Sequence, residues 1–284
     1  MSFLFSRIVG ASGGARRRNA AASAGLVIVG LFVLAAAAAD WLPLRNPLAM
    51  VPPARMAGPS WTMPFGADAF GRDLLSRTVY GARLSLSVAA ESVGIALAAG
   101  SLLGLLSGYA SGRTDQVLMR LMDVFFSFPA ILLALGIVAA LGPSPSNVVI
   151  AIAVVYTPIF ARVVRGPVLA LKEREFVEAT RALGAGAMLI VGRHIVPNLT
   201  SVLVVQTSIA LSWALLTEAS LSFLGLSAQP PAPSWGTMLN EGRQALELAP
   251  HMAIFPGLAI MLAVLGFNLL GDGLRDWLDP RGRA

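Results

Sequence analysis

Residues 20–39 read AAASAGLVIVGLFVLAAAAA, twenty consecutive residues without a charged side chain. At about 1.5 Å per residue, a helix of this length crosses the roughly 30 Å hydrocarbon core of a bilayer. Five further apolar runs follow along the chain, at 84–109, 118–141, 147–161, 199–226 and 251–270. Because lipid offers no partner to unpaired backbone groups, each run is expected to be helical. The sequence therefore predicts an all-α, polytopic membrane protein with about six transmembrane helices.

The composition agrees with this fold class. Of the 284 residues, 56% are hydrophobic and 13% are charged, whereas soluble domains carry roughly 25% charged residues. The mean hydropathy is +0.74. The six runs leave no contiguous stretch for a separate globular unit, so we expect one membrane domain.

Several kinds of chemistry are excluded or disfavoured. The chain has no cysteine, which excludes disulfides, thiolate catalysis and cysteine-ligated metals. His194 and His251 alone make a poor metal site. An intramembrane enzyme is disfavoured, because the sequence shows neither a metal-ligand cluster such as H-E-x-x-H nor a credible catalytic pair. We predict no catalytic residue and no metal site.

The distribution of cations predicts the orientation. The net charge of +6 and the isoelectric point near 10.9 do not indicate a nucleic-acid partner, because the cations form no long basic tract. Counted in alternate connecting segments, 15 of the 21 Lys and Arg residues fall on the side of both termini, and 6 fall on the other. Cytoplasmic segments carry the excess of cations, so both termini are predicted to be cytoplasmic.

This orientation divides the chain into five parts: a cytoplasmic tail, the first span, an external segment, a membrane core and a second cytoplasmic tail, at 1–19, 20–39, 40–83, 84–277 and 278–284. Within the core, residues 162–198 form a cytoplasmic loop. The external segments contain Trp41, Trp61 and Trp235, which suit an interface or a packed loop, so ordered external caps are expected.

The first run has a second interpretation. Three arginines precede it, and the small residues 35–39 resemble a signal-peptide cleavage site. Composition alone leaves a retained helix and a cleaved signal peptide open.

The cytoplasmic segment 166–198 reads GPVLALKEREFVEATRALGAGAMLIVGRHIVPN. Phe176, Ala179, Thr180 and Leu183 are spaced at i, i+3, i+4 and i+7, which places them on one face of a helix. Gly184 is a natural stop, because glycine adopts the left-handed conformation at little cost. A second short amphipathic turn over 188–194 is expected to end before the proline at 197. The pattern predicts a helix, a turn and a helix beneath the bilayer.

The spacing of Glu178, Ala179 and Thr180, then Gly184, then Pro197 resembles the Glu-Ala-Ala loop of ABC importer permeases. In that family the loop is the coupling helix, which docks on a cytoplasmic ATPase subunit and transmits its motion to the spans. The resemblance implies that Glu178 makes polar contacts at the docking surface and Ala179 permits close approach. It also implies that Gly184 sets the turn and Pro197 fixes the entry into the fifth span.

The loop departs from the family pattern at Thr180, His194 and Val196, where the family has Ala, Ile and Leu. The alternative is a generic helix on the membrane surface, which Lys172 and Arg174 would also suit. We favour docking, because spaced Gly and Pro residues have no role in a helix that lies on lipid.

Further stretches are similar to one subgroup. Residues 65–86, 119–137, 217–226, 233–243 and 255–281 resemble the C-type subunit of the dipeptide, oligopeptide and nickel permease group. This resemblance covers nearly everything from residue 65 onward, extends to the first span as a retained helix, and has Ala67 where the group usually has Thr. It implies type I ABC importer permease architecture in the bacterial inner membrane.

The resemblance also implies partners. These are a homologous B-type permease subunit in a heterodimer, two ATP-binding subunits and an extracytoplasmic solute-binding protein, besides membrane lipid. ATP and magnesium would be bound by the ATPase subunits, and this chain would bind no cofactor. In agreement, the sequence contains no G-x-x-x-x-G-K-[ST] phosphate-binding loop. Dipeptides, longer peptides, nickel chelates and some glycosides remain open as the solute.

Polar residues within the runs offer a second hypothesis. Glu91 and Glu218 lie in apolar runs, so neither is expected to face lipid. They could line the solute path, although bonding to a neighbouring helix or a position at the interface is the favoured interpretation. In a proton-coupled secondary transporter, the alternative function, one of them would carry the proton.

Three structural roles are also predicted. Glycines at 100, 104 and 108 recur every four residues and make a smooth strip for close helix packing. Asp123 and Arg120 could pair near the cytoplasmic end of the third span, and residues 271–276 are expected to anchor the end of the sixth span in the cytoplasm.

Overall fold

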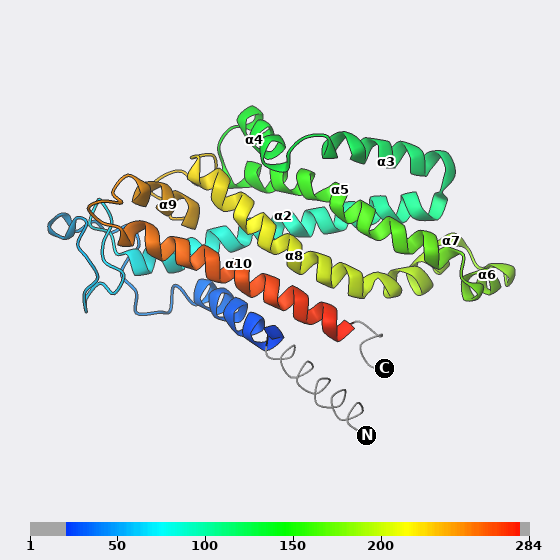
Figure 1. Ribbon diagram of the computed structural model, residues 1–284, viewed down its shortest axis with the longest axis horizontal. Coiled ribbons are helices and arrows are strands. Elements are labelled where there is room, and N and C mark those ends of the chain that lie inside the picture. The colour runs from blue at the N-terminus through cyan, green and yellow to red at the C-terminus, as the bar shows by residue number, and fades with distance from the viewer. Residues whose placement is uncertain (1–20, 279–284) are drawn as a thin grey trace, which may run out of the picture.

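The computed structural model describes residues 21–278, which are almost entirely helical (Figure 1). An N-terminal helix, Ala21–Ala37, comes first. The elements that follow are η1 (Pro52–Ala54), α2 (Leu74–Ala110), α3 (Gly112–Phe126), α4 (Ala130–Leu141), α5 (Pro145–Lys172), α6 (Glu175–Ala182), α7 (Ala187–Ile190), η2 (Val191–Ile195), α8 (Val196–Phe223), α9 (Trp235–Arg243) and α10 (His251–Leu278). No β-strand is present between residues 21 and 278, so the all-α prediction is confirmed there.

Four helices are long and apolar enough to cross a membrane: α2, α5, α10 and the continuous stretch Ala187–Phe223. The pair α3 and α4 makes a fifth if it is counted as one broken span. The N-terminal helix has the composition of a span, but its run begins at Ala20, outside the described residues. Several passes through the membrane are thus supported, and the count of six stays a prediction.

The third apolar run does not form the single straight span that was predicted. Helix α3 ends at Phe126, α4 begins at Ala130, and the two axes are bent by 88°. The break falls at Pro129, which is the N-cap of α4. A proline lacks an N–H and disfavours helical geometry in the residue before it, so the helix cannot continue through this point without loss.

The other helices extend beyond their apolar runs. Helix α2 begins at Leu74 and α5 continues to Lys172, past both Pro158 and Pro167. Helix α5 is therefore much longer than the fifteen or so apolar residues predicted for it. Hydropathy marks only the part that lies in lipid, whereas helical hydrogen bonding continues into the flanking polar residues.

Helices α2 and α5 lie side by side, and the glycine strip of α2 makes this possible. A Cβ atom on Gly100 would lie 2.5 Å from the carbonyl oxygen of Thr157, and one on Gly104 would lie 2.5 Å from that of Ala161. Gly108 meets the side chain of Val168 in the same way. The predicted packing role of the strip is confirmed.

The N-terminal helix packs on α10 (Figure 1). A Cβ atom on Gly25 would lie 2.5 Å from the backbone nitrogen of Leu270, and one on Gly266 would lie 2.8 Å from Ile28. Gly273 approaches Ala22 in the same interface. Small residues thus allow close approach along the length of the contact.

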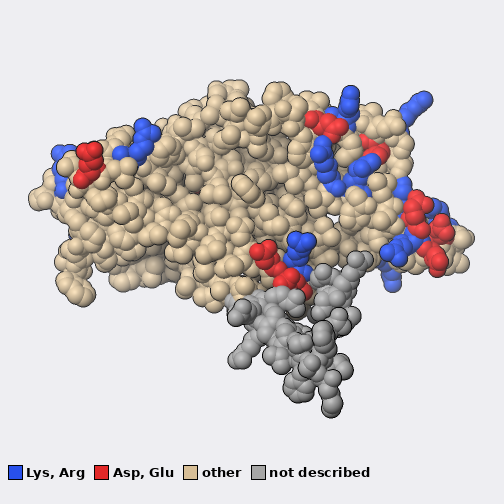
Figure 2. Space-filling view, in the orientation of Figure 1, with Lys and Arg blue, Asp and Glu red and all other residues tan. Residues whose placement is uncertain are grey.

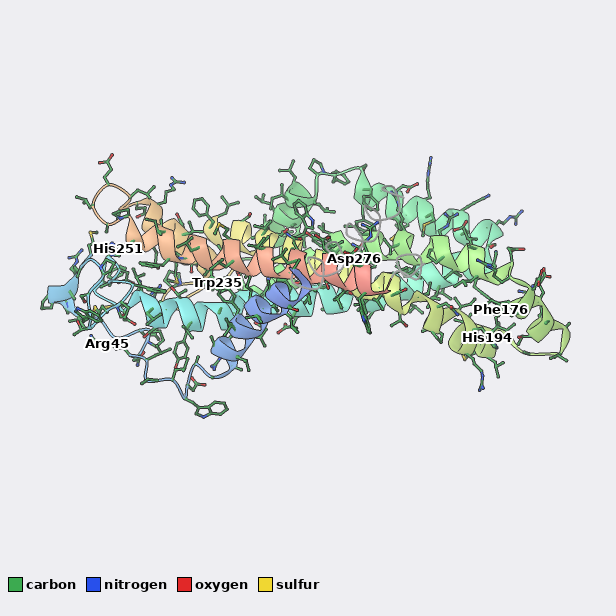
Figure 3. All side chains as sticks on the ribbon, turned by 60° about the horizontal axis from the view of Figure 1, so that its bottom comes forward. Arg45, Phe176, His194, Trp235, His251 and Asp276 are labelled. Carbon is green, nitrogen blue, oxygen red and sulfur yellow. The ribbon has the colours of Figure 1, made fainter. Side chains whose placement is uncertain are left out.

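The molecule is elongated (Figure 1). The segment 38–73 and α9 lie at one end and are called the cap, and α6 lies at the other end. Figure 3 shows Arg45 and His251 at the cap end and Phe176 and His194 at the opposite end. Trp235 is buried in the cap, where its Nε1 donates to the carbonyl oxygen of Thr78 over 2.9 Å. Trp41 and Trp61 are exposed, so of these three tryptophans only Trp235, the first residue of α9, is packed inside the protein.

Candidate functional site

Helix α6 joins the two long helices α5 and α8 at the end of the molecule opposite the cap (Figure 1). Val177 is its one buried residue. Its side chain belongs to an apolar cluster formed by residues from α5, α7, η2 and α8: Val164, Val168, Ile190, Ile195 and Leu199. A single apolar side chain therefore seats α6 in the junction between two candidate spans.

The remaining surface of α6 faces outward. Glu178 and Ala179 are exposed, and Thr180 donates its hydroxyl to the carbonyl oxygen of Phe176 over 2.7 Å. The face predicted from spacing is therefore not the buried one, since Val177 lies on a different side. The pattern identified a helix correctly but did not show which side packs.

The turn after α6 is built around Gly184, which has a φ of +85°. The N–H of Gly184 donates to the carbonyl of Arg181 over 3.0 Å, and the N–H of Ala185 donates to that of Thr180 over 3.2 Å. These two bonds form a Schellman motif, which favours glycine at the left-handed position. The expected turn at Gly184 is present, whereas its contribution to ATPase coupling stays a prediction.

The second expected helix does not end before Pro197. Helix α7 continues through a π-helical segment, η2, directly into α8, and Pro197 lies in the first turn of α8. A proline has no N–H to donate to the carbonyl group four residues earlier, and the proline ring clashes with that carbonyl group. The wider π turn over Val191–Ile195 changes the hydrogen-bonding register just before the proline, so the chain passes it without a break.

Two apolar side chains beside the Gly184 turn are more exposed than the spacing of the sequence could show. Leu183 and Met188 are each 89% exposed, although both are large hydrophobic residues. Phe176 is partly exposed and its ring lies 6.0 Å from that of His194 (Figure 3). Exposed apolar residues around a short helix are typical of a surface that another protein covers.

Glu91 and Glu218 have different environments. Glu91 is exposed on α2, and among residues 21–278 the structure records no hydrogen bond or ion pair for it. Glu218 is fully buried, and its Oε1 accepts a hydrogen bond of 2.6 Å from Ser222 on the same helix. Its Oε2 has no partner within the described part of the chain. Within the described part of the chain no contact between the two carboxylates is recorded, and their role in a solute path stays a prediction.

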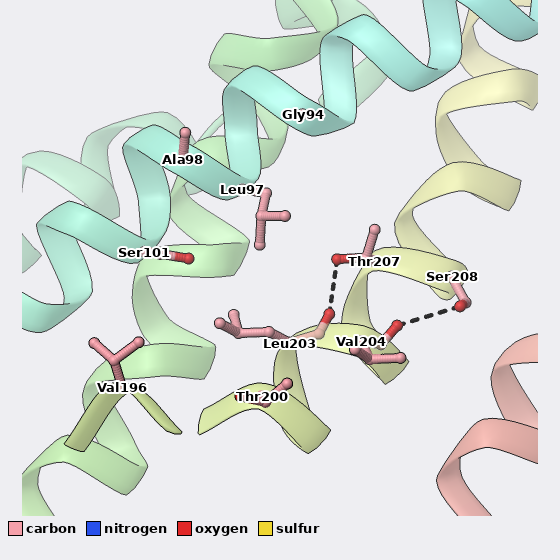
Figure 4. A pocket seen from close by; sticks show the side chains of 10 residues that line it. All are labelled: Gly94, Leu97, Ala98, Ser101, Val196, Thr200, Leu203, Val204, Thr207 and Ser208. Atoms are coloured by element: carbon pink, nitrogen blue, oxygen red, sulfur yellow. Dashed lines mark hydrogen bonds between the residues drawn. The ribbon is translucent and has the colours of Figure 1, made fainter. Parts of the chain in front are cut away.

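A cavity of about 570 Å³ lies between α2 and α8 (Figure 4). Its lining is mostly apolar, with four hydroxyl side chains: Ser101, Thr200, Thr207 and Ser208. Thr207 donates to the carbonyl oxygen of Leu203 over 2.7 Å, and Ser208 to that of Val204 over 3.2 Å. Sequence reasoning missed this cavity because isolated hydroxyl residues in an apolar run carry no distinctive signal.

A buried ionic network joins the start of α2 to α9 in the cap. Asp68 accepts from Arg72 over 2.5 Å and lies 3.4 Å from Arg77. Glu241 pairs with both arginines, each at 3.2 Å. The signal in the sequence is the cluster of charged residues in 68–77, directly before an apolar run. The sequence alone marks this cluster only as part of the stretch 65–86 that resembles the permease group.

The predicted pair of Asp123 and Arg120 is wrong. Asp123 pairs with Arg162 of α5 over 2.5 Å, and the Arg162 guanidinium lies 3.9 Å above the Phe126 ring. Within residues 21–278 Arg120 has no ion pair, although its spacing of i, i+3 makes it a neighbour of Asp123 on α3, because the carboxylate of Asp123 is bound by Arg162. No group of three or more His, Asp or Glu residues that could hold a metal ion is present within residues 21–278.

Known proteins are similar to this chain in sequence. Residues 100–284 match the profile of a family described as binding-protein-dependent transport system inner membrane component. The chain is 47% identical over 268 residues to a dipeptide transport system permease protein of Alkalihalophilus pseudofirmus, an alignment that covers 94% of this chain and 88% of the relative. It is 51% identical over 224 residues to a glutathione transport system permease protein of Pectobacterium atrosepticum, an alignment that covers 79% of this chain and 74% of the relative.

A solved structure has the same fold. An inward-facing form of the MetNI methionine ABC transporter matches with a TM-score of 0.58, covering 72% of this chain and 98% of the other. The sequence identity is 22%, so this likeness bears on the fold alone.

Proposed function

Because the chain belongs to the family of binding-protein-dependent transport system inner membrane components, we propose that it is the permease subunit of an ATP-driven importer of short peptides. The relatives named above are permeases for dipeptides and for glutathione, a modified tripeptide. Short peptides are therefore the substrate class that the similarities favour over nickel chelates or glycosides.

One observation carries the mechanism: α6 is short, exposed and joined directly to two long helices. Only two residues separate α5 from α6, and α7, η2 and α8 form one continuous helix on the other side. Val177 seats α6 in the apolar cluster between them. A push on α6 is thus delivered to α5 and α8 together, which is how a domain motion can reorient membrane helices.

The partners follow from this role. We infer a heterodimer with a homologous B-type permease subunit, two ATP-binding subunits under the α6 end, and a solute-binding protein at the cap end. ATP and magnesium belong to the ATP-binding subunits, and this chain carries no ATPase site of its own. The protein spans the bacterial inner membrane several times, with both termini and α6 in the cytoplasm.

Within the coupling surface, each residue has a specific task. Glu178 and Ala179 are exposed on α6, and Leu183 and Met188 flank its end. We assign the polar contact to Glu178 and the apolar contact to Leu183 and Met188. Gly184 and Pro197 shape the backbone on either side of the contact.

The cavity between α2 and α8 supports a solute path along these helices. Three of its hydroxyl groups, those of Thr200, Thr207 and Ser208, donate to carbonyl groups of their own helix and can exchange those bonds for contacts with a peptide backbone. Glu91 lies one helical turn before Gly94, which lines the cavity, and is accessible. The proton-coupled alternative gains no support, since Glu218 is enclosed by packing and the similar proteins are ABC-type permeases.

The test uses the full chain co-expressed with its partner subunits. Glu178→Lys reverses the charge at the contact, and Gly184→Pro forbids the φ of +85°. We expect both variants to reach the membrane, to lose the copurifying ATP-binding subunits, and to lose uptake of a labelled dipeptide. Glu247→Lys, an exposed position after α9, makes the same charge change at the other end and should keep the ATP-binding subunits bound.

A second variant separates docking from transmission. Val177→Ala leaves the exposed surface of α6 intact but loosens its seat in the apolar cluster. We expect the ATP-binding subunits to remain bound while peptide imported per ATP falls severalfold. Normal uptake in Glu178→Lys, or peptide uptake without ATP, would refute the proposed function.

A further inference from the structure

Helix α3 segregates its charges between two faces. Asp115 accepts from Arg165 of α5 at Nε over 2.5 Å and at Nη2 over 2.6 Å. Asp123 accepts from Arg162 of the same helix over 2.5 Å. Each acidic side chain of α3 is therefore paired with an arginine of α5, Asp115 at 15% exposure and Asp123 at 49%.

The opposite face of α3 combines cations with apolar side chains. Arg113, Val117, Arg120, Leu121 and Val124 follow the spacing i, i+4, i+7, i+8 and i+11, which places them on one side of the helix. Val117, Leu121 and Val124 are 68%, 50% and 54% exposed. Both arginines are exposed too, and within residues 21–278 neither has a hydrogen bond or ion pair.

The position of α3 along the molecule matches the edge of a bilayer. Figure 2 shows charged side chains at the cap end and over the α3 and α6 end, with a further group at the lower edge beside the grey residues and a wide uncharged area between the cap end and the other two groups. Helix α3 lies where charged side chains resume, on the side of α6, and cations project outward there (Figures 1 and 2). A helix at this depth meets lipid headgroups on its outer face.

An anionic lipid surface fits this face better than another protein segment. Arginine buries its aliphatic stem along apolar surface while its charged end reaches phosphate. Lipid supplies acyl carbon for the apolar residues and a phosphate for each cation at the same depth. Because both aspartates of α3 are paired with arginines of α5, the two arginines of the outer face keep uncompensated positive charge, which an anionic leaflet attracts.

We propose that the outer face of α3, formed by Arg113, Val117, Arg120, Leu121 and Val124, binds anionic phospholipid of the adjoining leaflet in preference to zwitterionic lipid. The inference goes beyond solute import, because it assigns a lipid site to a helix that has no task in ATPase docking. Bound lipid would anchor α3 in the leaflet, while the ion pairs of Asp115 and Asp123 join α3 to α5.

The absence of cysteine from the chain makes a direct test possible. Gln116→Cys, an exposed position close to this face, accepts a single fluorophore. The labelled full chain, assembled with its partner subunits, is placed in vesicles of phosphatidylcholine and phosphatidylglycerol in equal parts, with one lipid at a time carrying bromine as the quencher. We expect stronger quenching by brominated phosphatidylglycerol, with a preference of about fivefold for each cation at the surface.

The double variant Arg113→Gln/Arg120→Gln should abolish this preference. Arg45→Gln/Arg55→Gln removes the same charge from the segment before α2, where Arg55 bonds to the carbonyl oxygen of Ala69, and should leave the preference unchanged. Three results would overturn the proposal: equal quenching by the two lipids in the parent protein, a preference that survives the double variant, or quenching by neither lipid, which would mean that a protein subunit covers the face.

Discussion

The glycines of α2 show how single residues set the distance between two helices. At Gly104 the nearest atom to an added Cβ is a backbone oxygen of α5, which cannot swing away as a side chain would. At Gly257 of α10 an added Cβ meets no atom within 4 Å. Glycine is therefore required for close packing at position 104 but not at position 257.

We predict that Gly104→Ala lowers stability by about 1–3 kcal/mol, because the added methyl forces α2 and α5 apart. Gly257→Ala should be neutral or slightly stabilising, since alanine is the better helix former in open space. Thermal unfolding of both variants in detergent checks this. Equal midpoints for the two variants would contradict close packing at Gly104.

The two carboxylates in apolar runs show what a sequence leaves undecided about single residues. Glu91 and Glu218 carry the same signal in the sequence, yet one is accessible and the other is enclosed beside Ser222. The difference arises from neighbouring helices that lie far away along the chain. Accessibility makes Glu91 the better candidate for contact with solute.

Prolines have different effects in different elements. Pro129 separates α3 from α4 at an 88° bend, whereas Pro158 and Pro167 lie inside α5 without ending it. Before Pro197, a π-helical segment keeps the chain helical. Each internal proline loses a hydrogen bond, so a helix continues through it only where tertiary packing offsets that loss.

The cap depends on its buried ionic network. Asp68 and the two arginines it contacts are almost completely buried, and Glu241 brings α9 to the same site. A buried pair stripped of one partner leaves an uncompensated charge. The network therefore stabilises the junction of α2 and α9 only as a complete unit.

We predict that Asp68→Asn destabilises the protein by about 3 kcal/mol, because Arg72 and Arg77 keep their charge in a buried site. The control is Asp40→Asn. Asp40 is exposed, and hydrogen bonds from Arg83 and Tyr80 hold its pKa below the ordinary value. Removal of the Asp40 charge should leave the unfolding midpoint unchanged, because exposed ion pairs contribute little to the stability of the fold. Comparable losses in the two variants would refute the assignment.

Across the whole molecule, the cap and α6 lie at opposite ends of a bundle of long helices (Figure 1). This separation suits a permease, in which solute arrives on one side and ATP-driven motion on the other. The likeness to the MetNI structure confirms the importer-permease fold that the sequence predicted. The N-terminal helix lies outside the α2–α5 pair and packs on α10.

This packing leads to a prediction about the mature chain. Gly25 and Gly273 allow contacts too close to form by chance between unrelated surfaces, so the N-terminal helix is expected to be retained. An epitope tag placed before residue 1 should therefore remain on the protein in purified membranes, with the intact mass unchanged. Release of the tag with a fragment ending near residue 39 would instead indicate a cleaved signal peptide.

The sequence by itself determined the class of fold, most of the helices and the family, because hydropathy and spaced Gly and Pro residues are local signals. It identified the α6 helix, the turn at Gly184 and the glycine strip of α2 for the same reason. It did not decide which distant residue packs against or pairs with a given side chain.

The tertiary structure alone decided which side of α6 is buried, which arginine pairs with Asp123, and where Glu218 lies. It also revealed the ionic network of the cap and the cavity between α2 and α8. Each of these features is formed by residues brought together from distant parts of the chain. Burial and pairing are properties of such contacts, so a one-dimensional pattern does not contain them.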